Sequence, residues 1–370
     1  MATKSAPNKP TRKKAARGAT KPRAGAVKTR KISLALQGGG AHGAVTWGVL
    51  DRLLEDDRID TNAISGTSAG ALNAVAVAYG LHLDGCAGAR AKLDELWSAI
   101  SRSGQLFSPI KRTPLDMIMG GYNLDSSLSY QFFDTLTRTF SPYQLNPFDF
   151  NPLQDVMADV IDFDRLRTCT NVNLYLSATN VRTGKVQVFE TKDVSLEVVA
   201  ASTCLPFIFK AVEIDGEHYW DGGYMGNPVL FPFFYTEDSN DIVVVHVNPL
   251  TRDDVPTTAP DIMNRINEIS FNSSLLREFR AINFVHKLLK EGWIKDDYVD
   301  RLSDVRVHSI RSDQSLDDLS VASKFNTEWE FLNQLKDRGR QIADQWLAEH
   351  FDAVGTRSSV DLREIFDSTH

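Results

Sequence analysis

The sequence predicts an α/β fold with a mostly parallel central sheet. Two strand-to-helix units follow one another within residues 32–79, and residues 241–247 (Asp-Ile-Val-Val-Val-His-Val) predict a buried strand much later in the chain. Because parallel strands must be joined by crossovers, which are usually helical, this alternation favours parallel pairing. With 370 residues, 42% of them hydrophobic and 24% charged, the chain can form one large domain with an appendage, or two domains.

The N-terminal segment differs in charge from the rest of the chain. Residues 1–31 hold eleven Lys or Arg and no Asp or Glu, although the whole chain has a net charge of −7. We expect residues 1–30 to form a disordered basic tail, because a segment with almost no large aliphatic residues cannot offset the entropy of ordering. Such a tail either solubilises the protein or rests on its acidic body, or it adheres to anionic lipid, nucleic acid or another polyanionic surface.

Three features bear on the compartment. The three cysteines (Cys86, Cys169 and Cys204) are odd in number and lack metal-ligand spacing, which favours buried thiols in a reducing compartment. The basic segment lacks the apolar stretch of a secretory signal. No run approaches the length that spans a membrane. We therefore expect a cytoplasmic protein in which any contact with a membrane is peripheral.

The first half of the chain predicts strands and helices in alternation. Their predicted ranges are 32–37 for the first strand, 62–65 for the second strand, 69–79 for a buried helix and 84–101 for a further helix. Between the two strands, after the Gly38–Gly43 loop, apolar residues at 45, 49, 50, 53 and 54 predict another helix. Residues 104–152 interrupt this alternation with prolines, a Gly-Gly pair and many aromatic residues. We expect helical patches there, which form either a cap over an apolar pocket or a plain insertion.

Sheet-forming patterns return in the second half. The predicted strands are 173–180, 185–189, 212–214, 218–220, 241–247 and 305–310, and the predicted helices are 194–202, 262–290 and 324–351. We therefore expect a basic tail at 1–30, a core at 31–255 with the 104–152 segment as a possible cap, and a mainly helical C-terminal extension at 256–370 packed on that core.

A serine lies where the second strand is expected to turn into a helix, in Gly66-Thr67-Ser68-Ala69-Gly70. Such a turn leaves little room for side chains, so Gly66 and Gly70 relieve crowding while the Ser68 hydroxyl points outward. The helix that follows directs its N-terminal N–H groups to the same place, which favours developing negative charge. This pattern is that of a nucleophile elbow, and the alternative is a tight turn with a capping serine.

A glycine-rich loop, Gly38-Gly39-Gly40-Ala41-His42-Gly43, follows the first strand. It matches the dinucleotide-binding pattern, but the second strand lacks the acidic residue that would hold a ribose. A phosphate-binding P-loop is excluded because no Gly-Lys-Ser/Thr follows. The remaining interpretation is an oxyanion hole, in which consecutive glycines let backbone N–H groups converge on one point. His42 would either add positive field there or cap the following helix.

A serine nucleophile needs a base. The histidines considered for this role are His42, His82, His218 and His246. They are scattered, and His246 lies within a buried strand pattern that favours a core histidine. Only one strand precedes the strand that leads to the serine, unlike the order in an α/β-hydrolase. Asp221, in Asp221-Gly222-Gly223, is the remaining candidate. It is either part of a turn or a carboxylate that desolvation makes a stronger base.

Together these three motifs resemble the patatin-like phospholipase family, and Ala201-Ser202-x-x-Leu205-Pro206 resembles a further block of that family. The resemblance runs from residue 31 to about residue 250. It implies a three-layer α/β/α sandwich and hydrolysis of acyl esters without a metal or a cofactor. It also implies a dyad of Ser68 and Asp221 and an oxyanion hole from the backbone of Gly38, Gly39 and Gly40. The residues that support these motifs are His42, Gly43, Gly66, Gly70, Gly222 and Gly223. The family often has Arg or Lys where His42 stands, so a permanent positive charge is not implied there.

We therefore expect a serine hydrolase of lipid carboxylic esters, of the phospholipase A, lysophospholipase or carboxylesterase type. Its partner would be a lipid or acyl-ester substrate, with residues 1–31 touching an anionic membrane or granule surface, and nucleic acid is not expected to bind. One alternative is a catalytically weak protein of the same fold that docks to membranes or granules. Another is a nucleic-acid-associated protein led by its basic tail.

Overall fold

The computed structural model describes residues 29–112, 116, 121–125, 127–236, 239–295 and 304–366. Nearly all of the predicted basic tail therefore lies outside the described residues.

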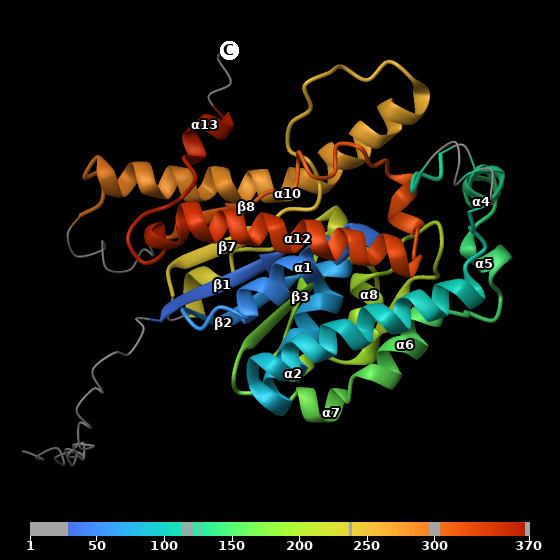
Figure 1. Cartoon of the computed structure of the whole chain (residues 1–370), viewed down its shortest axis with the longest axis horizontal. Coiled ribbons are helices and arrows are strands. Elements are labelled where there is room, and N and C mark those ends of the chain that lie inside the picture. Colours follow the sequence, from blue (N-terminus) through green and yellow to red (C-terminus); the bar gives the residue numbers. More distant parts are fainter. Residues whose placement is uncertain are drawn as a thin grey trace, which may run out of the picture.

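A mixed, mostly parallel sheet forms the centre of the molecule (Figure 1). Its strands are β1 (Arg30–Leu36), β2 (Ile59–Gly66), β3 (Asn173–Asn180), β4 (Val186–Glu190), β5 (Val212–Ile214), β6 (Glu217–Asp221), β7 (Asp241–Val245) and β8 (Arg306–Ile310). The strand order is β5-β6-β3-β2-β1-β7-β8, and β4 pairs with β3. The pairs among β3, β2, β1, β7 and β8 are parallel, whereas β4, β5 and β6 pair antiparallel. The predicted fold class is confirmed.

Helices connect and cover the strands. They are α1 (Gly43–Leu54), α2 (Ala69–Phe107), α4 (Leu128–Thr139), α5 (Pro142–Leu145), α6 (Pro152–Val160), α7 (Phe163–Leu166), α8 (Leu196–Ser202), α9 (Phe233–Thr236), α10 (Ala259–Lys290), α12 (Trp329–His350) and α13 (Leu362–Phe366). Short 3-10 turns are η1 (Gly40–His42), η2 (Thr191–Asp193), η3 (Gly222–Tyr224), η4 (Ala322–Phe325) and η5 (Phe351–Ala353).

Alternate residues of β7 face opposite sides of the sheet, as the period of a strand requires. Val243 and Val245 belong to an apolar cluster with α1, α2 and α12, which lie in front of the sheet in Figure 1. Ile242 and Val244 belong to a second cluster with side chains of α10. Helical layers on both faces make the three-layer α/β/α sandwich that the family resemblance implied.

The C-terminal part of the chain completes the sheet as well as covering it. β8 pairs with β7, and Asp241 at the start of β7 accepts hydrogen bonds from Arg306 and His308 of β8. α12 crosses α1 closely, since a Cβ added to Gly339 would lie 2.0 Å from the carbonyl oxygen of Val45. This part of the chain therefore supplies an edge strand and a helical layer of the core.

Helix α2 joins the two helices predicted at 69–79 and 84–101. Asp84 and Gly85 have non-helical backbone angles, and Gly85 has a positive φ of 57°, so the helix is kinked there. The predicted closing helix at 324–351 begins later, at Trp329, because the residues before it form η4 and a short extended connection.

The expectation of buried thiols is wrong for one cysteine. Cys86 is exposed because it follows the kink in α2 on the side away from the core, whereas Cys169 and Cys204 are buried.

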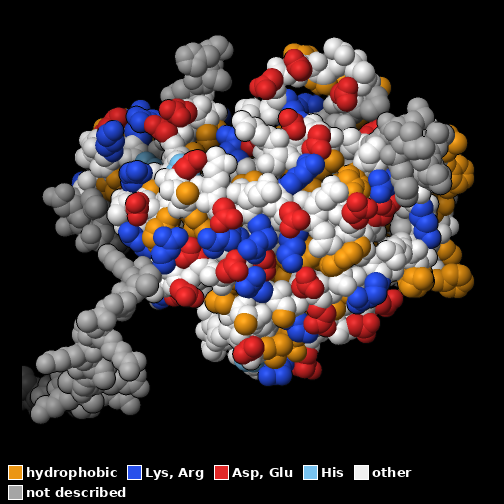
Figure 2. Space-filling view, in the orientation of Figure 1, with side chains coloured by type: hydrophobic (Ala, Val, Ile, Leu, Met, Phe, Trp, Pro, Cys, Tyr) orange, Lys and Arg blue, Asp and Glu red, His pale blue; other side chains and the backbone are white. Residues whose placement is uncertain are grey.

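The 104–152 segment holds the end of α2 together with α4 and α5, and residues 113–115, 117–120 and 126 of it lie outside the described part. Its exposed large apolar side chains, which we call the apolar cap, are Leu106, Phe107, Leu128, Phe132, Phe140, Tyr143, Leu145, Phe148 and Phe150. Figure 2 shows hydrophobic side chains gathered at the edge of the molecule that α4 and α5 occupy. None of the helices that the structure describes has both the length and the apolar character needed to cross a membrane.

Candidate active site

Ser68 lies at the junction of β2 and α2, where the chain turns sharply. Its backbone angles are φ 55° and ψ −125°, a conformation that side chains rarely adopt and that marks local strain. Its N–H donates to the Ser202 hydroxyl of α8 at 3.0 Å. Gly66 ends β2, and Gly70 lies in the first turn of α2 against the carbonyl of Leu36. The strand-to-helix turn thus has the geometry expected of a nucleophile elbow, with the serine half-buried.

Asp221 ends β6 and is completely buried. Its Oδ1 accepts the Gly223 N–H at 2.7 Å, its own N–H donates to the Cys204 carbonyl at 2.8 Å, and its carbonyl accepts from Thr179 at 2.9 Å. These bonds fix both the carboxylate and its backbone.

The carboxylate of Asp221 faces the serine. Burial raises the pKa of Asp221 to about 6, and the hydrogen bonds from Gly223 and Ser68 lower it in part. The contact with the Ser68 hydroxyl falls outside standard hydrogen-bond geometry, since Oδ2 of Asp221 has no hydrogen-bond partner among the described residues. The Asp221 carboxyl therefore lies close enough to the Ser68 hydroxyl to be influenced by it, and one of its oxygens is left without a partner. Hydrogen bonds between catalytic groups are often long in the absence of substrate and tighten only in the complex.

The glycine loop lies against the serine. A Cβ added to Gly38 would be 2.6 Å from the Cβ of Ser68, so only glycine fits there. The Gly38 N–H donates to Asn227 Oδ1 at 2.7 Å and is therefore occupied in this conformation. The N–H groups of Gly39 and Gly40 have no hydrogen-bond partner among the residues that the structure describes. The backbone donors still available next to Ser68 thus come from Gly39 and Gly40.

His42 does not play either of the roles expected for it. It is buried, and its Nε2 pairs with the Ser323 hydroxyl at 2.7 Å. Burial, and then the charge of Lys324, lower the pKa of His42 well below its usual value, so the imidazole is neutral at pH 7. It makes no side-chain capping bond to α1. Gly43 begins α1, and a Cβ added there would lie 2.6 Å from the Cβ of Ala69.

Gly222 and Gly223 form η3 next to Asp221. They allow close packing on β3 and α10 rather than on the elbow: a Cβ on Gly222 would lie 2.3 Å from the Ser177 carbonyl oxygen, and one on Gly223 would lie 2.5 Å from the Phe271 ring. Their role in the site is to hold Asp221, through the Gly223 N–H.

Polar side chains that the sequence reasoning did not assign support the glycine loop. Gln37 Oε1 accepts the N–H groups of Val247 and Asn248 at 3.0 and 3.1 Å. Asn248 Nδ2 donates to the Gly38 carbonyl at 2.8 Å, and Asn227 Oδ1 accepts the Gly38 N–H. The available signal was that Gln37 is the last residue of one predicted strand and Asn248 directly follows another, since the ends of parallel strands meet at one edge of a sheet.

Within the described part of the chain, no hydrogen bond or ion pair joins a histidine to Ser68 or Asp221. His246 is buried, its Nε2 pairs with the Ser309 hydroxyl at 3.1 Å, and burial lowers its pKa to about 4. His218 is half-buried on β6, where it faces Glu213. The interpretation of His246 as a core histidine agrees with its burial.

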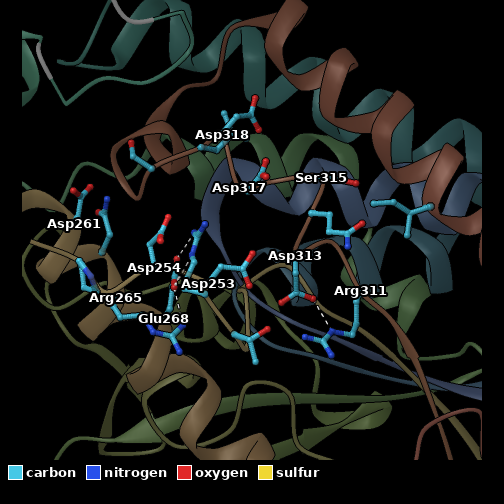
Figure 3. Close-up of a pocket in the computed structure, with 18 of the residues that line it drawn as sticks. Asp253, Asp254, Asp261, Arg265, Glu268, Arg311, Asp313, Ser315, Asp317 and Asp318 are labelled. Carbon is cyan, nitrogen blue, oxygen red and sulfur yellow. Dashed lines mark hydrogen bonds and ion pairs between the residues drawn. The ribbon is translucent and has the colours of Figure 1, made fainter. Parts of the chain in front are cut away.

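A polar cavity of about 1230 Å³ lies elsewhere, between the segment after β7, the segment after β8 and α12 (Figure 3). Carboxylates dominate its walls. Its arginines are neutralised locally, because Arg252 and Arg265 pair with Glu268 while Arg311 pairs with Asp313. None of the predicted site residues lines this cavity, and its charge does not suit an acyl chain.

Comparison with known families decides the classification. The family model of patatin-like phospholipases matches residues 34–234, which is more than half of the chain. The chain belongs to the patatin-like phospholipase family. This patatin-like chain contains the elbow, the glycine loop and Asp221 within the matched residues, and its family membership supports a lipid hydrolase function.

Two solved structures are similar to the patatin-like chain at low identity. VipD from Legionella pneumophila is 16% identical, with 87% of this chain and 67% of VipD covered and a TM-score of 0.40. ExoU from the type III secretion system of Pseudomonas aeruginosa, solved in complex with SpcU, is 14% identical, with 85% of this chain and 53% of ExoU covered and a TM-score of 0.29. The chain thus spans about two thirds of VipD and about half of ExoU. Among curated proteins, none matches the chain significantly.

Proposed function

We propose that the chain is a serine lipid acyl hydrolase, of the phospholipase A, lysophospholipase or carboxylesterase type, in which Ser68 and Asp221 form a catalytic dyad. Ser68 Oγ attacks the ester carbonyl carbon while Asp221 Oδ2 accepts the hydroxyl proton. The N–H groups of Gly39 and Gly40 stabilise the tetrahedral oxyanion. The alcohol leaves with the proton from Asp221, and water activated by the same carboxylate then releases the fatty acid from Ser68.

One observation carries this proposal: a completely buried carboxylate, one oxygen of which has no partner, lies next to a strained serine at the N-terminus of a helix. A pKa of about 6 for Asp221 brings this carboxylate much closer to a useful base strength than an ordinary aspartate. Retaining a strained backbone and an unsatisfied buried oxygen at one place costs stability, which supports a catalytic rather than a structural role.

The lipid would approach over the apolar cap. Tyr143 contacts the segment after α8, because its hydroxyl accepts the Ala211 N–H and its ring lies under Lys210. Phe207, in that same segment, is exposed, and the segment leads directly to Cys204, which holds Asp221. We propose that these exposed apolar side chains contact the lipid, and that residues 1–31 add attraction to anionic head groups.

A second candidate function is docking to membranes or granules with little catalysis. The occupied N–H of Gly38 favours it, because one of the three expected oxyanion donors is not free. Labelling with a serine-reactive fluorophosphonate separates the two functions, since a docking protein would not react.

The test of the proposed function is to incubate the full chain with a panel of short-chain esters, lysophospholipids and phospholipids and to identify the released acids by mass spectrometry. Ser68→Ala is the matched control, and circular dichroism verifies that it is folded. We expect acid release by the wild-type protein and none above background by the variant. Equal release by both proteins, or release by neither, contradicts the proposal.

A further inference from the structure

Lys324 is a half-buried cation next to the glycine loop, although it lies far outside the residues that match the family. It belongs to η4, and a Cβ added to Gly40 would lie 2.6 Å from the Lys324 carbonyl oxygen. Its ammonium donates to Asn248 Oδ1 at 2.8 Å and to Asn267 Oδ1 at 3.3 Å, and it lies 5.7 Å from the centre of the Phe271 ring.

The charge of this lysine is not neutralised by a direct ion pair. Among the described residues, no carboxylate lies within ion-pair distance of its ammonium. Glu268 is the nearest acid that influences it, but that carboxylate is shared by Arg252 and Arg265. Removing an ammonium even partly from water without a carboxylate is costly, so such a group is retained where its charge serves a purpose.

Two hydrogen bonds through Asn248 join the ammonium to the glycine loop. Asn248 accepts from Lys324 through its Oδ1 and donates through its Nδ2 to the Gly38 carbonyl at 2.8 Å. Gly38 in turn packs on Ser68. The neutral His42, held by Ser323 next to Lys324 in the chain, cannot supply positive charge to this loop.

We propose that Lys324 is a positioning residue of the oxyanion site, which holds the glycine loop through Asn248 and whose positive charge favours the oxyanion formed at Gly39 and Gly40. This inference rests on the proposed function. In the low dielectric of a buried site, a fixed charge acts over several ångströms on charge that develops in the transition state. It therefore lowers the barrier of the chemical step more than it strengthens substrate binding.

The protonation of Lys324 gives a readout that a structural role would not change. Burial lowers the pKa of Lys324 to about 8, with Glu268 raising it and Arg252 lowering it further. The other titratable or charged groups around it are His42 from η1, Arg265 from α10 and Arg338 from α12, whose own charge influences His42. The lysine is therefore mostly protonated at pH 7 and loses its charge as pH rises through about 8.

The experiment measures kcat and KM for a soluble short-chain ester from pH 5 to 10. The proteins are the wild-type chain, Lys324→Gln, which keeps an N–H donor without the charge, and Lys324→Met. Lys192→Met, which changes an exposed lysine of η2, is the control. We expect both Lys324 variants to lose at least about tenfold in kcat at pH 7 with KM within about twofold. The wild-type activity should fall above about pH 8, and the variants should lack that decline.

Equal kcat in wild-type and folded Lys324→Gln protein would overturn the inference about the lysine. Hydrolysis by the wild-type protein in the same experiment would still support the proposed function. Should both variants fail to fold, the wild-type pH profile decides alone: activity that stays constant from pH 7 to 10 contradicts a role for the lysine charge. Absence of hydrolysis in the wild-type protein, with no release that Ser68→Ala abolishes, instead contradicts the proposed function itself.

Discussion

At the scale of single residues, the buried carboxylate of Asp221 lowers the stability of the folded protein when it is charged. The carboxylate is completely buried, and only its Oδ1 has a hydrogen-bond donor. Because burial raises its pKa to about 6, the folded state binds a proton more tightly than the unfolded chain does. Folding is therefore favoured by Asp221 when it is protonated and is progressively opposed as pH rises from about 4 through 6, where the folded protein must hold the charge.

Asp221→Asn should consequently remove activity and add stability. A neutral amide avoids the buried charge, so we expect the variant to exceed the wild type by up to about 2–3 kcal/mol at pH 8, and this advantage to vanish near pH 4. Thermal unfolding at both pH values measures it. Ser68→Ala keeps the buried carboxylate and is the matched control, because its stability relative to the wild type should not follow this pH dependence. If the Asn variant is less stable than the wild type at pH 8, the buried charge of Asp221 does not destabilise the folded protein.

At the scale of single elements, α4 is an amphipathic helix with an exposed apolar side. None of its residues is fully buried, although Tyr130 and Phe133 pack partly on a small cluster. The only charged side chains between residues 127 and 148 are Asp134 and Arg138, and they form an ion pair with each other. A neutral surface rich in aromatic residues suits the interface of a lipid layer better than contact with water.

Charged substitutions in the apolar cap should therefore lower hydrolysis of phospholipid vesicles without lowering hydrolysis of a soluble ester. In Phe132→Asp and Phe148→Asp, we expect hydrolysis of long-chain phospholipid vesicles to fall by about tenfold, since an aspartate at a lipid interface costs on the order of 1 kcal/mol or more. Hydrolysis of a soluble short-chain ester should stay unchanged, because neither side chain contacts the dyad. Phe284→Asp, an exposed position on α10, is the control. An equal loss on both substrates would show that the cap supports the fold rather than lipid contact.

At the scale of the whole molecule, residues beyond the family match are part of the same core. β8 is an edge strand, α10 covers one face of the sheet, and α12 packs against α1 on the other. The large side chains that α10 and α12 bury completely include Leu275, Phe279, Phe331 and Leu335. Removing these layers would expose both sides of the sheet to water.

A chain that ends at residue 255 should therefore lose the cooperative fold. We expect it to lack a sharp thermal transition by circular dichroism and to bind a hydrophobic dye, because most of its apolar sheet surface would be uncovered. Deletion of residues 1–28 is the control and should leave the transition temperature nearly unchanged. A truncated chain that unfolds cooperatively would show that the segment up to residue 255 is an independent domain.

The sequence predicted the parts of this architecture that depend on local pattern. The strand-to-helix alternation, the hairpins and the long α10 follow from periodicity, and the elbow follows from the spacing of Gly66 and Gly70 around Ser68. What local pattern could not provide were contacts between distant segments. Lys324 was expected to begin a closing helix, and its approach to the glycine loop depends on how η4 packs against η1. Likewise, the occupation of the Gly38 N–H by Asn227 requires β6 and β1 to be placed in space.

The most direct test of the account is to map the site of fluorophosphonate labelling by tryptic mass spectrometry at pH 8, with folded Ser68→Ala and Asp221→Asn proteins in parallel. We predict a single adduct on Ser68 in the wild-type chain, no adduct in Ser68→Ala, and labelling slowed by at least about a hundredfold in Asp221→Asn, since the serine then lacks its base. An adduct on another residue, or labelling of the Asp221 variant at the wild-type rate, would contradict the proposed dyad.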